Sequence, residues 1–189
     1  MSVHNKWAAE LGTHFDKFTW KRIYKACFKT TRDHNLIWTQ YRILNRILGT
    51  KELLYKMKIK NDSLCRLCNT GTETIMHIFC SCPKSTAFIN SIILWIVTIV
   101  KIQISTAPND MILGYLNSDV DFIPKNIILM LLKSYIFNSA VLGRPLNIFS
   151  FQKKIINTLK EHEFSYKISL EEEKFNKIFA RWKILFQNF

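Results

Sequence analysis

Apolar side chains recur every three or four residues along most of this chain, the spacing of one face of an α-helix. The pattern predicts helices around Trp20, over residues 36–48, 85–100, 127–142 and 149–160, and after Ser169. A turn is expected at 108–110, and Ser169 and Glu172 have the spacing of a capping box. With only 5 Gly and 4 Pro in 189 residues, the predicted fold class is mostly α, a multi-helix domain.

Two of the predicted helices combine an apolar face with a basic one. In the first, the inward positions are Trp20, Ile23, Tyr24 and Cys27, and the opposite face carries Lys21, Lys25 and Lys29. In helix 36–48, the inward positions are Ile37, Tyr41, Leu44 and Leu48. Trp38, Arg42 and Arg46 then lie one turn apart on a neighbouring face.

The positive charge is unevenly distributed. The chain carries +13 overall: residues 1–60 have 13 Lys and Arg against 4 Asp and Glu, residues 61–120 have 3 against 4, and residues 121–189 have 11 against 6. A basic surplus of this size favours a polyanionic partner such as RNA, DNA or an anionic membrane surface. The surplus flanks the middle of the chain, and a basic stretch with Lys56, Lys58 and Lys60 leads into it.

The middle of the chain has the spacing of metal ligands. Cys65 and Cys68 form a CxxC pair, His77 follows after eight residues and Cys82 after four more. Three thiolates and one imidazole are the ligands of a closed tetrahedral zinc site. Four protein ligands leave no open position for water, so the predicted Zn²⁺ is a single structural ion.

Two neighbouring residues leave alternatives open. Cys80 also offers a thiolate one helical turn after His77, although Cys82, just before the helix-stopping Pro83, is preferred. Glu73 lies four residues before His77, so its carboxylate could accept the other ring N–H on a short helix. A solvated carboxylate near a helix N-terminus is the competing interpretation.

Composition limits the other functional classes. No nucleophile, base and orienting group come together in sequence, and the acid pair Asp119 and Asp121 is typical of a solvated turn, so no enzyme and no small-molecule substrate are predicted. The apolar stretches 92–100 and 127–132 are shorter than the roughly 20 residues of a membrane helix. With five cysteines and no apolar leader, we expect reduced thiols in the nucleus or cytoplasm.

Several segments resemble the C-terminal zinc-binding region of LINE-type (non-LTR) retrotransposon reverse transcriptases. They are residues 20–24 (WKRIY), 31–33 (TRD), 38–50 (WTQYRILNRILGT), the metal spacing from Ser63 to Cys82, 112–114, 133–136 and 175–182. The likeness runs from about residue 7 to near the end. By position it implies Cys65, Cys68, His77 and Cys82 as ligands, since the family more often has an aromatic residue where Cys80 stands.

The resemblance implies a non-catalytic tail that helps the element's enzyme to engage its RNA template or target during target-primed reverse transcription. The chain departs from the whole polyprotein, because no polymerase palm, no aromatic-x-Asp-Asp motif and no endonuclease segment occurs in it. The predicted segments are a basic helical part (1–60), a zinc module (61–84) and a helical part (85–189) of one compact domain.

Two functional hypotheses follow. In the first, the chain binds nucleic acid, with RNA favoured over DNA, through basic side chains on phosphates and aromatic or Arg planes on bases. The candidate contacts are Lys21, Lys25, Lys29, Trp38, Arg42, Arg46, Lys56, Lys58 and Lys60. The plain alternative is that these are solvated helix faces, with Trp38 in the core.

In the second hypothesis, zinc holds a scaffold domain that docks a protein partner such as the polymerase domain. Aromatic residues near turns and chain ends would form the docking patch. They are Phe149, Phe151, Phe186 and Phe189.

Overall fold

The computed structural model describes residues 2–116 and 121–186, and within them the chain is almost entirely helical. The α-helices are α1 (Val3–Leu11), α2 (Lys17–Thr30), α3 (His34–Leu44), α4 (Lys51–Lys56), α5 (Pro83–Val100), α6 (Pro108–Leu113), α7 (Phe122–Val141), α8 (Ile148–Ile168) and α9 (Glu172–Phe179). A π-helical turn, η1 (His77–Ser81), and a 3₁₀ turn, η2 (Trp182–Phe186), complete the order. In this described part the only β pairing is a single bridge between Leu64 and Thr72. The predicted mostly α fold with a metal cluster in its middle is confirmed.

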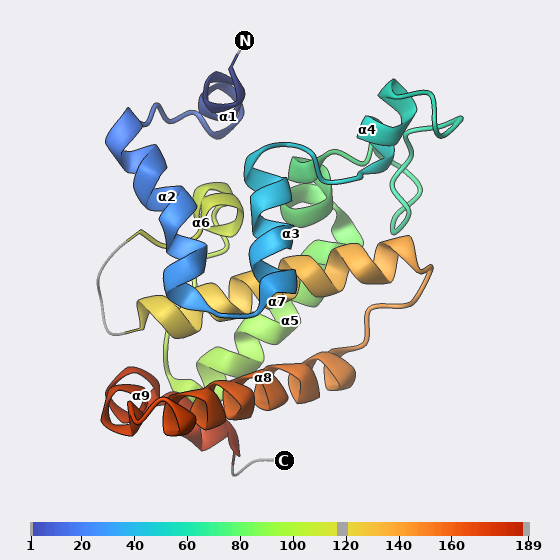
Figure 1. The fold of residues 1–189 in the computed structure, drawn as a ribbon. Helices are drawn as coiled ribbons and strands as arrows, with labels where there is room; N and C mark the ends of the chain where they lie inside the picture. Colours follow the sequence, from blue (N-terminus) through green and yellow to red (C-terminus); the bar gives the residue numbers. More distant parts are fainter. Residues whose placement is uncertain (1, 117–120, 187–189) are drawn as a thin grey trace.

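Helix α7 runs through the middle of the molecule (Figure 1). Helices α2 and α3 pack across it, α8 lies along its other side, and α5 packs against α8, η1 and η2. The residues of α7 between Ile127 and Leu132 are buried on every side. A helix that is apolar all round must be covered on all faces, which explains its central place.

One ionisable side chain is buried inside this apolar helix. Lys133 is 1% exposed, and its Nζ donates a hydrogen bond to the carbonyl oxygen of Met111 at 2.8 Å. Burial lowers the pKa of Lys133 to about 7, although the nearby thiols of Cys80 and Cys27 act in the opposite direction. The folded protein therefore holds this amine partly neutral around pH 7 and largely neutral only at higher pH.

The hydrophobic core includes residues from all three predicted segments. It extends from Trp7 in α1, through Cys65 and Phe79 near the predicted metal site, to Leu185 in η2. The boundaries 1–60, 61–84 and 85–189 stay a prediction.

The predicted inward face of helix 36–48 was wrong in part: Leu44 and Leu48 are fully buried and Ile37 is partly buried, but Tyr41 is not inside. α3 ends at Leu44, and its buried side chains are Leu36, Thr39, Gln40, Ile43 and Leu44. Tyr41, expected inside, is 40% exposed. Gln40 on this buried face has a distant partner, because its Nε2 donates to the carbonyl oxygen of Ile112 at 2.8 Å.

Three predictions for the part of the chain after residue 100 also need correction. The expected turn at 108–110 begins a helix, α6, with Pro108 in its first turn. The helix predicted over 149–160 continues to Ile168 as α8. Ser169 does not cap α9, whose N-cap is Glu171 without a side-chain hydrogen bond; instead the Ser169 hydroxyl accepts a bond from Arg32.

The expected aromatic docking patch holds only in part. Phe149 is exposed, Phe186 is half-buried and Phe151 is fully buried against Phe88 and Tyr135. Phe189 lies outside the described residues.

Helix α5 also meets the length and composition of a membrane span. It has 18 residues with a mean hydropathy of 1.5, because the structure adds residues 83–91 to the apolar stretch noted in the sequence. One third of it (33%) is buried inside the structure. Core helices of soluble proteins pass the same test, so this feature is weak evidence for a membrane.

Candidate metal centre

A short loop presents the first two cysteines. The Cys65 N–H donates to the carbonyl oxygen of Gly71 at 2.7 Å, and the Asn69 N–H donates to the carbonyl oxygen of Cys65 at 2.9 Å. Asn69 adopts a left-handed conformation (φ 59°), which Asn tolerates better than most residues. These bonds fold residues 65–69 into a tight turn that directs both sulfurs to the same side.

The second pair of ligands comes from the two ends of η1. His77 begins this π-helical turn, and the Cys82 N–H closes it with a hydrogen bond of 2.7 Å to the carbonyl oxygen of His77. Cys82 then leaves the turn in an extended conformation, and α5 starts at Pro83. The wider turn brings a ring and a sulfur five residues apart to the same point.

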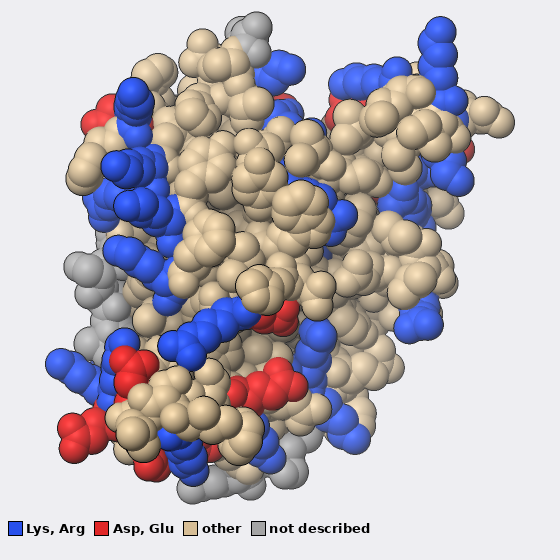
Figure 2. Space-filling view, in the orientation of Figure 1, with Lys and Arg blue, Asp and Glu red and all other residues tan. Residues whose placement is uncertain are grey.

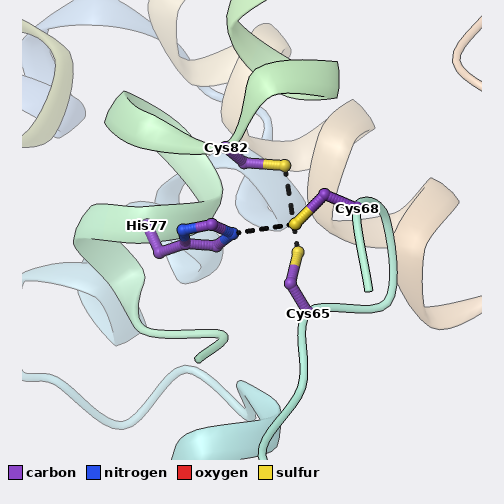
Figure 3. Close-up of side chains that lie close together, drawn as sticks. All are labelled: Cys65, Cys68, His77 and Cys82. Atoms are coloured by element: carbon purple, nitrogen blue, oxygen red, sulfur yellow. Dashed lines mark hydrogen bonds between the residues drawn. The ribbon is translucent and has the colours of Figure 1, made fainter. Parts of the chain in front are cut away.

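The four predicted ligands meet (Figure 3): their ligand atoms all lie within 4.8 Å of one another. Cys65 Sγ is 3.9 Å from Cys82 Sγ, and Cys68 Sγ is 3.3 Å from His77 Nε2. With Zn–S bonds of about 2.3 Å, two sulfurs of a tetrahedral site are roughly 3.8 Å apart. The donor set and its spacing therefore fit Zn²⁺, and this chain has a site for one structural zinc ion.

The two cysteines of the first turn differ in acidity. Burial raises the pKa of Cys65 to about 12, with a further contribution from Cys82. The pKa of Cys68 falls to about 5: burial opposes this shift, but hydrogen bonds from Thr70 and Gly71 and the contact with His77 outweigh it. A bound zinc ion holds its thiol ligands deprotonated, and Cys68 is already favourable for that role.

Cys82, not Cys80, is the sulfur in the cluster. The Cys80 side chain packs against the hydrophobic core, where burial raises its pKa to about 11 and Lys133 partly offsets this. On η1, Cys80 lies only three residues after His77. The π-helical turn carries residue 82 back to the histidine instead.

Both expectations for Glu73 were wrong, because it is neither a partner of His77 nor solvated. The side chain is completely buried. Its two oxygens accept the N–H groups of Lys51 (2.9 Å) and Arg66 (2.8 Å), and the Arg66 guanidinium lies 3.3 Å away. Glu73 thus joins the start of α4 to the CxxC turn. The Nδ1 atom of His77 instead faces Ser81 Oγ at 3.5 Å.

Gly71 is a site residue that the sequence analysis missed. A Cβ atom at this position would lie 2.8 Å from Cε1 of His77, closer than van der Waals contact allows. Gly71 therefore makes room for the ligating ring. Its place between Cys68 and His77 was visible in the sequence, but its contact with the imidazole was not.

The predicted nucleic-acid contacts on α2 and α3 are exposed. Lys21, Lys25 and Lys29 line the outer side of α2. On α3, Trp38 is 55% exposed, so it is not a core residue, and the Arg42 guanidinium lies 5.9 Å from its ring centre. Trp38 and Tyr41 are stacked, with ring centres 5.4 Å apart and an interplanar angle of 8°.

Arg46 does not belong to this face, contrary to the sequence prediction. It lies beyond the end of α3 with φ 60°, pairs with Glu10 and covers the ring of Trp7 at 4.3 Å. The Arg46 guanidinium thus binds two residues of α1 and helps to hold that helix in place.

Lys56, Lys58 and Lys60 are exposed around the end of α4, where Lys56 pairs with Glu52. Figure 2 shows Lys and Arg gathered along α2 and around α4, with a largely uncharged surface between them. The basic residues of α2 and those around α4 are thus two separate groups on this side of the molecule, and further Lys and Arg are scattered over its lower part.

The acid pair Asp119 and Asp121, expected in a solvated turn, is described only in part. Asp119 lies outside the described residues. Asp121 accepts a hydrogen bond from Trp182 Nε1 at 3.3 Å and pairs with Arg181 at 3.5 Å.

Comparison with known proteins agrees with the metal centre. No curated protein matches the chain. Residues 2–88, which contain α1 to α4, all four ligands and the start of α5, match the protein family described as zinc-binding in reverse transcriptase. The matched family is a zinc-binding accessory domain, and no catalytic domain is matched. The N-terminal half of this chain is therefore similar to the zinc-binding part of reverse-transcriptase proteins.

Proposed function

We propose that this chain binds single-stranded nucleic acid, with RNA favoured over DNA, through the outer faces of α2 and α3. Stacking on aromatic rings and contacts of basic side chains with phosphates are the usual means of binding single strands. In this proposal zinc has a structural role, because four protein ligands leave it no open position.

The observation that carries the proposal is the stacked pair of Trp38 and Tyr41. Large aromatic side chains usually bury their rings, and here two adjacent rings are open to solvent in nearly parallel planes. Arg42 beside Trp38 adds a positive planar group. Such a surface can stack unpaired bases, whereas the bases of a duplex are already stacked on each other.

The phosphates would follow the row of Lys21, Lys25 and Lys29 on the neighbouring helix. These side chains are exposed, and α2 and α3 are packed together. Lys56, Lys58 and Lys60 form a separate group around α4, across a largely uncharged surface, and would contact another part of the strand nearer the zinc turn (residues 63–82). Phosphate contacts of this kind position the strand without reading its sequence.

The biological setting we propose is that of a non-catalytic tail of a LINE-type (non-LTR) reverse transcriptase. The family match of residues 2–88 supports the reverse-transcriptase context. In that setting the chain would engage the template or target during target-primed reverse transcription, in the nucleus or cytoplasm. A polymerase domain would be its protein partner, and neither a membrane nor a small-molecule substrate is involved.

The test is fluorescence anisotropy of labelled single-stranded RNA, duplex RNA and single-stranded DNA with the zinc-loaded protein at several salt concentrations. Trp38→Ala with Tyr41→Ala should weaken binding by roughly 1–3 kcal/mol per stacked base. Changing Lys21, Lys25 and Lys29 to Glu should lower the salt dependence. The matched control changes Lys154, Lys160 and Lys177, exposed elsewhere, to Glu. Equal effects of the two triple variants would contradict the proposal.

A second candidate function is docking of a protein partner, which a different surface favours. Phe164, Ile168 and Leu170 are exposed around the turn from α8 to α9, and Leu170 is 93% exposed. Apolar side chains grouped in this way are typical of an interaction site. If docking is the main function, Phe164→Ser with Leu170→Ser would abolish capture of the polymerase domain, while RNA binding would be absent from the wild type.

A further inference from the structure

A groove with a volume of about 610 Å³ lies beside the zinc turn. Its walls come from three places that are far apart in sequence: the CxxC turn, the N-terminal half of α5, and the turn that joins α7 to α8. None of its residues was among the contacts predicted from the sequence. The groove is of a size that typically holds a small organic ligand or one nucleotide.

Each wall contributes one cation. They are Arg66 in the CxxC turn, Lys84 in the first turn of α5 and Arg144 after α7. Among the described residues that line the groove, no Asp or Glu occurs. The N-terminal end of α5, an 18-residue helix, adds its positive dipole end beside Lys84. The charge of the groove is thus complementary to an anion.

Arg66 is held in a fixed position by the zinc turn. Its Nη2 donates to the carbonyl oxygen of Gly49 at 3.3 Å, and its backbone N–H is bound by Glu73. Its Nη1 is 3.3 Å from Glu73 Oε1, an ion-pair distance, yet makes no hydrogen bond within the described part of the chain. Glu73 offsets part of the Arg66 charge.

The charges of the other two cations are not offset by an acidic side chain of the described residues. Lys84 and Arg144 are exposed, and neither side chain has an ion-pair partner in residues 2–116 and 121–186. The groove therefore combines one oriented guanidinium with two cations that are not neutralised.

Part of the groove lining, called its floor below, is apolar. Leu67, Ala87, Phe88, Ala140 and Leu146 contribute to it. A phosphate ion alone would leave this floor without a partner, whereas a nucleotide has both a charged phosphate and a flat, weakly polar base. A duplex keeps its bases paired and stacked inside, so only an unpaired nucleotide can place its base there.

We propose that this groove binds an unpaired nucleotide of a single-stranded nucleic acid, with phosphate oxygens on Lys84, Arg144 and Arg66 and the base on the apolar floor. The proposal rests on the proposed nucleic-acid function and adds a second contact, next to the zinc turn. Zinc then has a direct consequence for binding, because the turn that it stabilises supplies one wall and positions Arg66.

The test compares two double variants of the zinc-loaded full chain with labelled single-stranded RNA of roughly 12 nucleotides. Lys84→Glu/Arg144→Glu should weaken binding about tenfold or more, and losing two phosphate contacts should make the log–log salt slope shallower by about 1.4. The control, Lys160→Glu/Lys177→Glu, makes the same change of net charge at exposed positions outside the groove and should leave the slope unchanged. Zinc content and melting temperature are measured for both variants.

The outcomes separate this inference from the proposed function. If the groove variant behaves like its control while the Trp38 and Tyr41 variant loses binding, the groove proposal is overturned and the proposed face stands. If only the groove variant loses binding, the groove stands and the α2–α3 face does not. Binding of a labelled acidic peptide that depends on Lys84 and Arg144, with RNA binding unaffected, would overturn the proposal in favour of a protein partner. If the groove variant loses zinc or stability, Lys84→Gln/Arg144→Gln replaces it under the same criteria.

Discussion

Helix α7 and the zinc turn pack against each other, yet they are held in place by different forces. α7 buries a continuous run of apolar side chains, each of which contributes about 1.5–3 kcal/mol when removed from water. The segment between Ser63 and Cys82 has one π-helical turn and one β bridge, and it depends on four ligands and a buried carboxylate. Stability in α7 is spread over many residues, whereas in the zinc turn it depends on a few.

The difference predicts how each region responds to damage. A single substitution in α7 removes only a small part of the free energy that its many buried apolar side chains contribute together. A single ligand substitution in the turn removes the metal, and structural zinc sites in small modules provide apparent free energies of about 10–16 kcal/mol.

The largest expected effect is that of Cys65→Ser. We expect the variant to lose its zinc ion and to melt about 10 °C or more below the wild type, while most of the helical circular dichroism remains because none of the α-helices α1 to α9 contains a ligand. Cys27→Ser is the matched control, since Cys27 is a buried thiol outside the cluster. A wild type that folds fully without metal would contradict this expectation.

Substitution of the two thiols at the end of η1 distinguishes the metal ligand, Cys82, from the core residue, Cys80. Cys82→Ser should abolish stoichiometric zinc binding, whereas Cys80→Ser should retain the metal, because Cys80 packs against the core and not in the cluster. Zinc content after dialysis measures both. The reverse result would move the fourth ligand to Cys80.

Glu73→Gln tests the other support of the turn. The carboxylate accepts one backbone N–H on each oxygen, whereas the amide has a single acceptor oxygen, and the Arg66 charge loses its partner, so the free energy of unfolding should fall by about 3 kcal/mol. Urea unfolding of the zinc-loaded protein measures it. Glu172→Gln, at an exposed position, should change stability by less than about 0.5 kcal/mol. Similar small effects for both would show that the buried carboxylate is dispensable.

The smallest effect concerns Lys133 in the core. Its folded pKa of about 7 lies below the unfolded value of 10.5, so between these values the unfolded chain binds a proton that the folded chain does not. The free energy of unfolding should therefore rise with pH, by about 2 kcal/mol between pH 7 and 9, relative to Lys133→Met. Urea unfolding at both pH values measures the difference, and parallel pH profiles of the two proteins would refute it.

The sequence predicted the metal ligands and most helices because both depend on local spacing. Ligand chemistry needs a few residue types at fixed intervals, and α7 is apolar over a long run. The buried face of α3 was not predictable in the same way. It includes the polar residues Thr39 and Gln40, which a sequence pattern places on the surface, and the partner of Gln40 is the carbonyl oxygen of Ile112, far away in sequence.

Glu73 and Arg46 show the same limit for charged residues. Glu73 was expected either to contact His77 or to be solvated, and Arg46 was expected on the same face as Arg42. In the structure Glu73 binds Lys51 and Arg66, and Arg46 binds Glu10 and Trp7. Their partners come from other segments, which a helical spacing rule does not see. The groove beside the zinc turn is likewise assembled from three distant segments.

The π-helical turn between His77 and Cys82 makes this part of the chain sensitive to length more than to composition. The two ligands stand at its ends, and its backbone bond closes only over five residues. Substitution of the exposed Ser81 leaves the register intact, but an insertion or deletion of one residue would rotate Cys82 by about 100° around the helix axis, away from the imidazole. Among natural variants of this chain, gaps should therefore be absent from this segment even where its side chains differ.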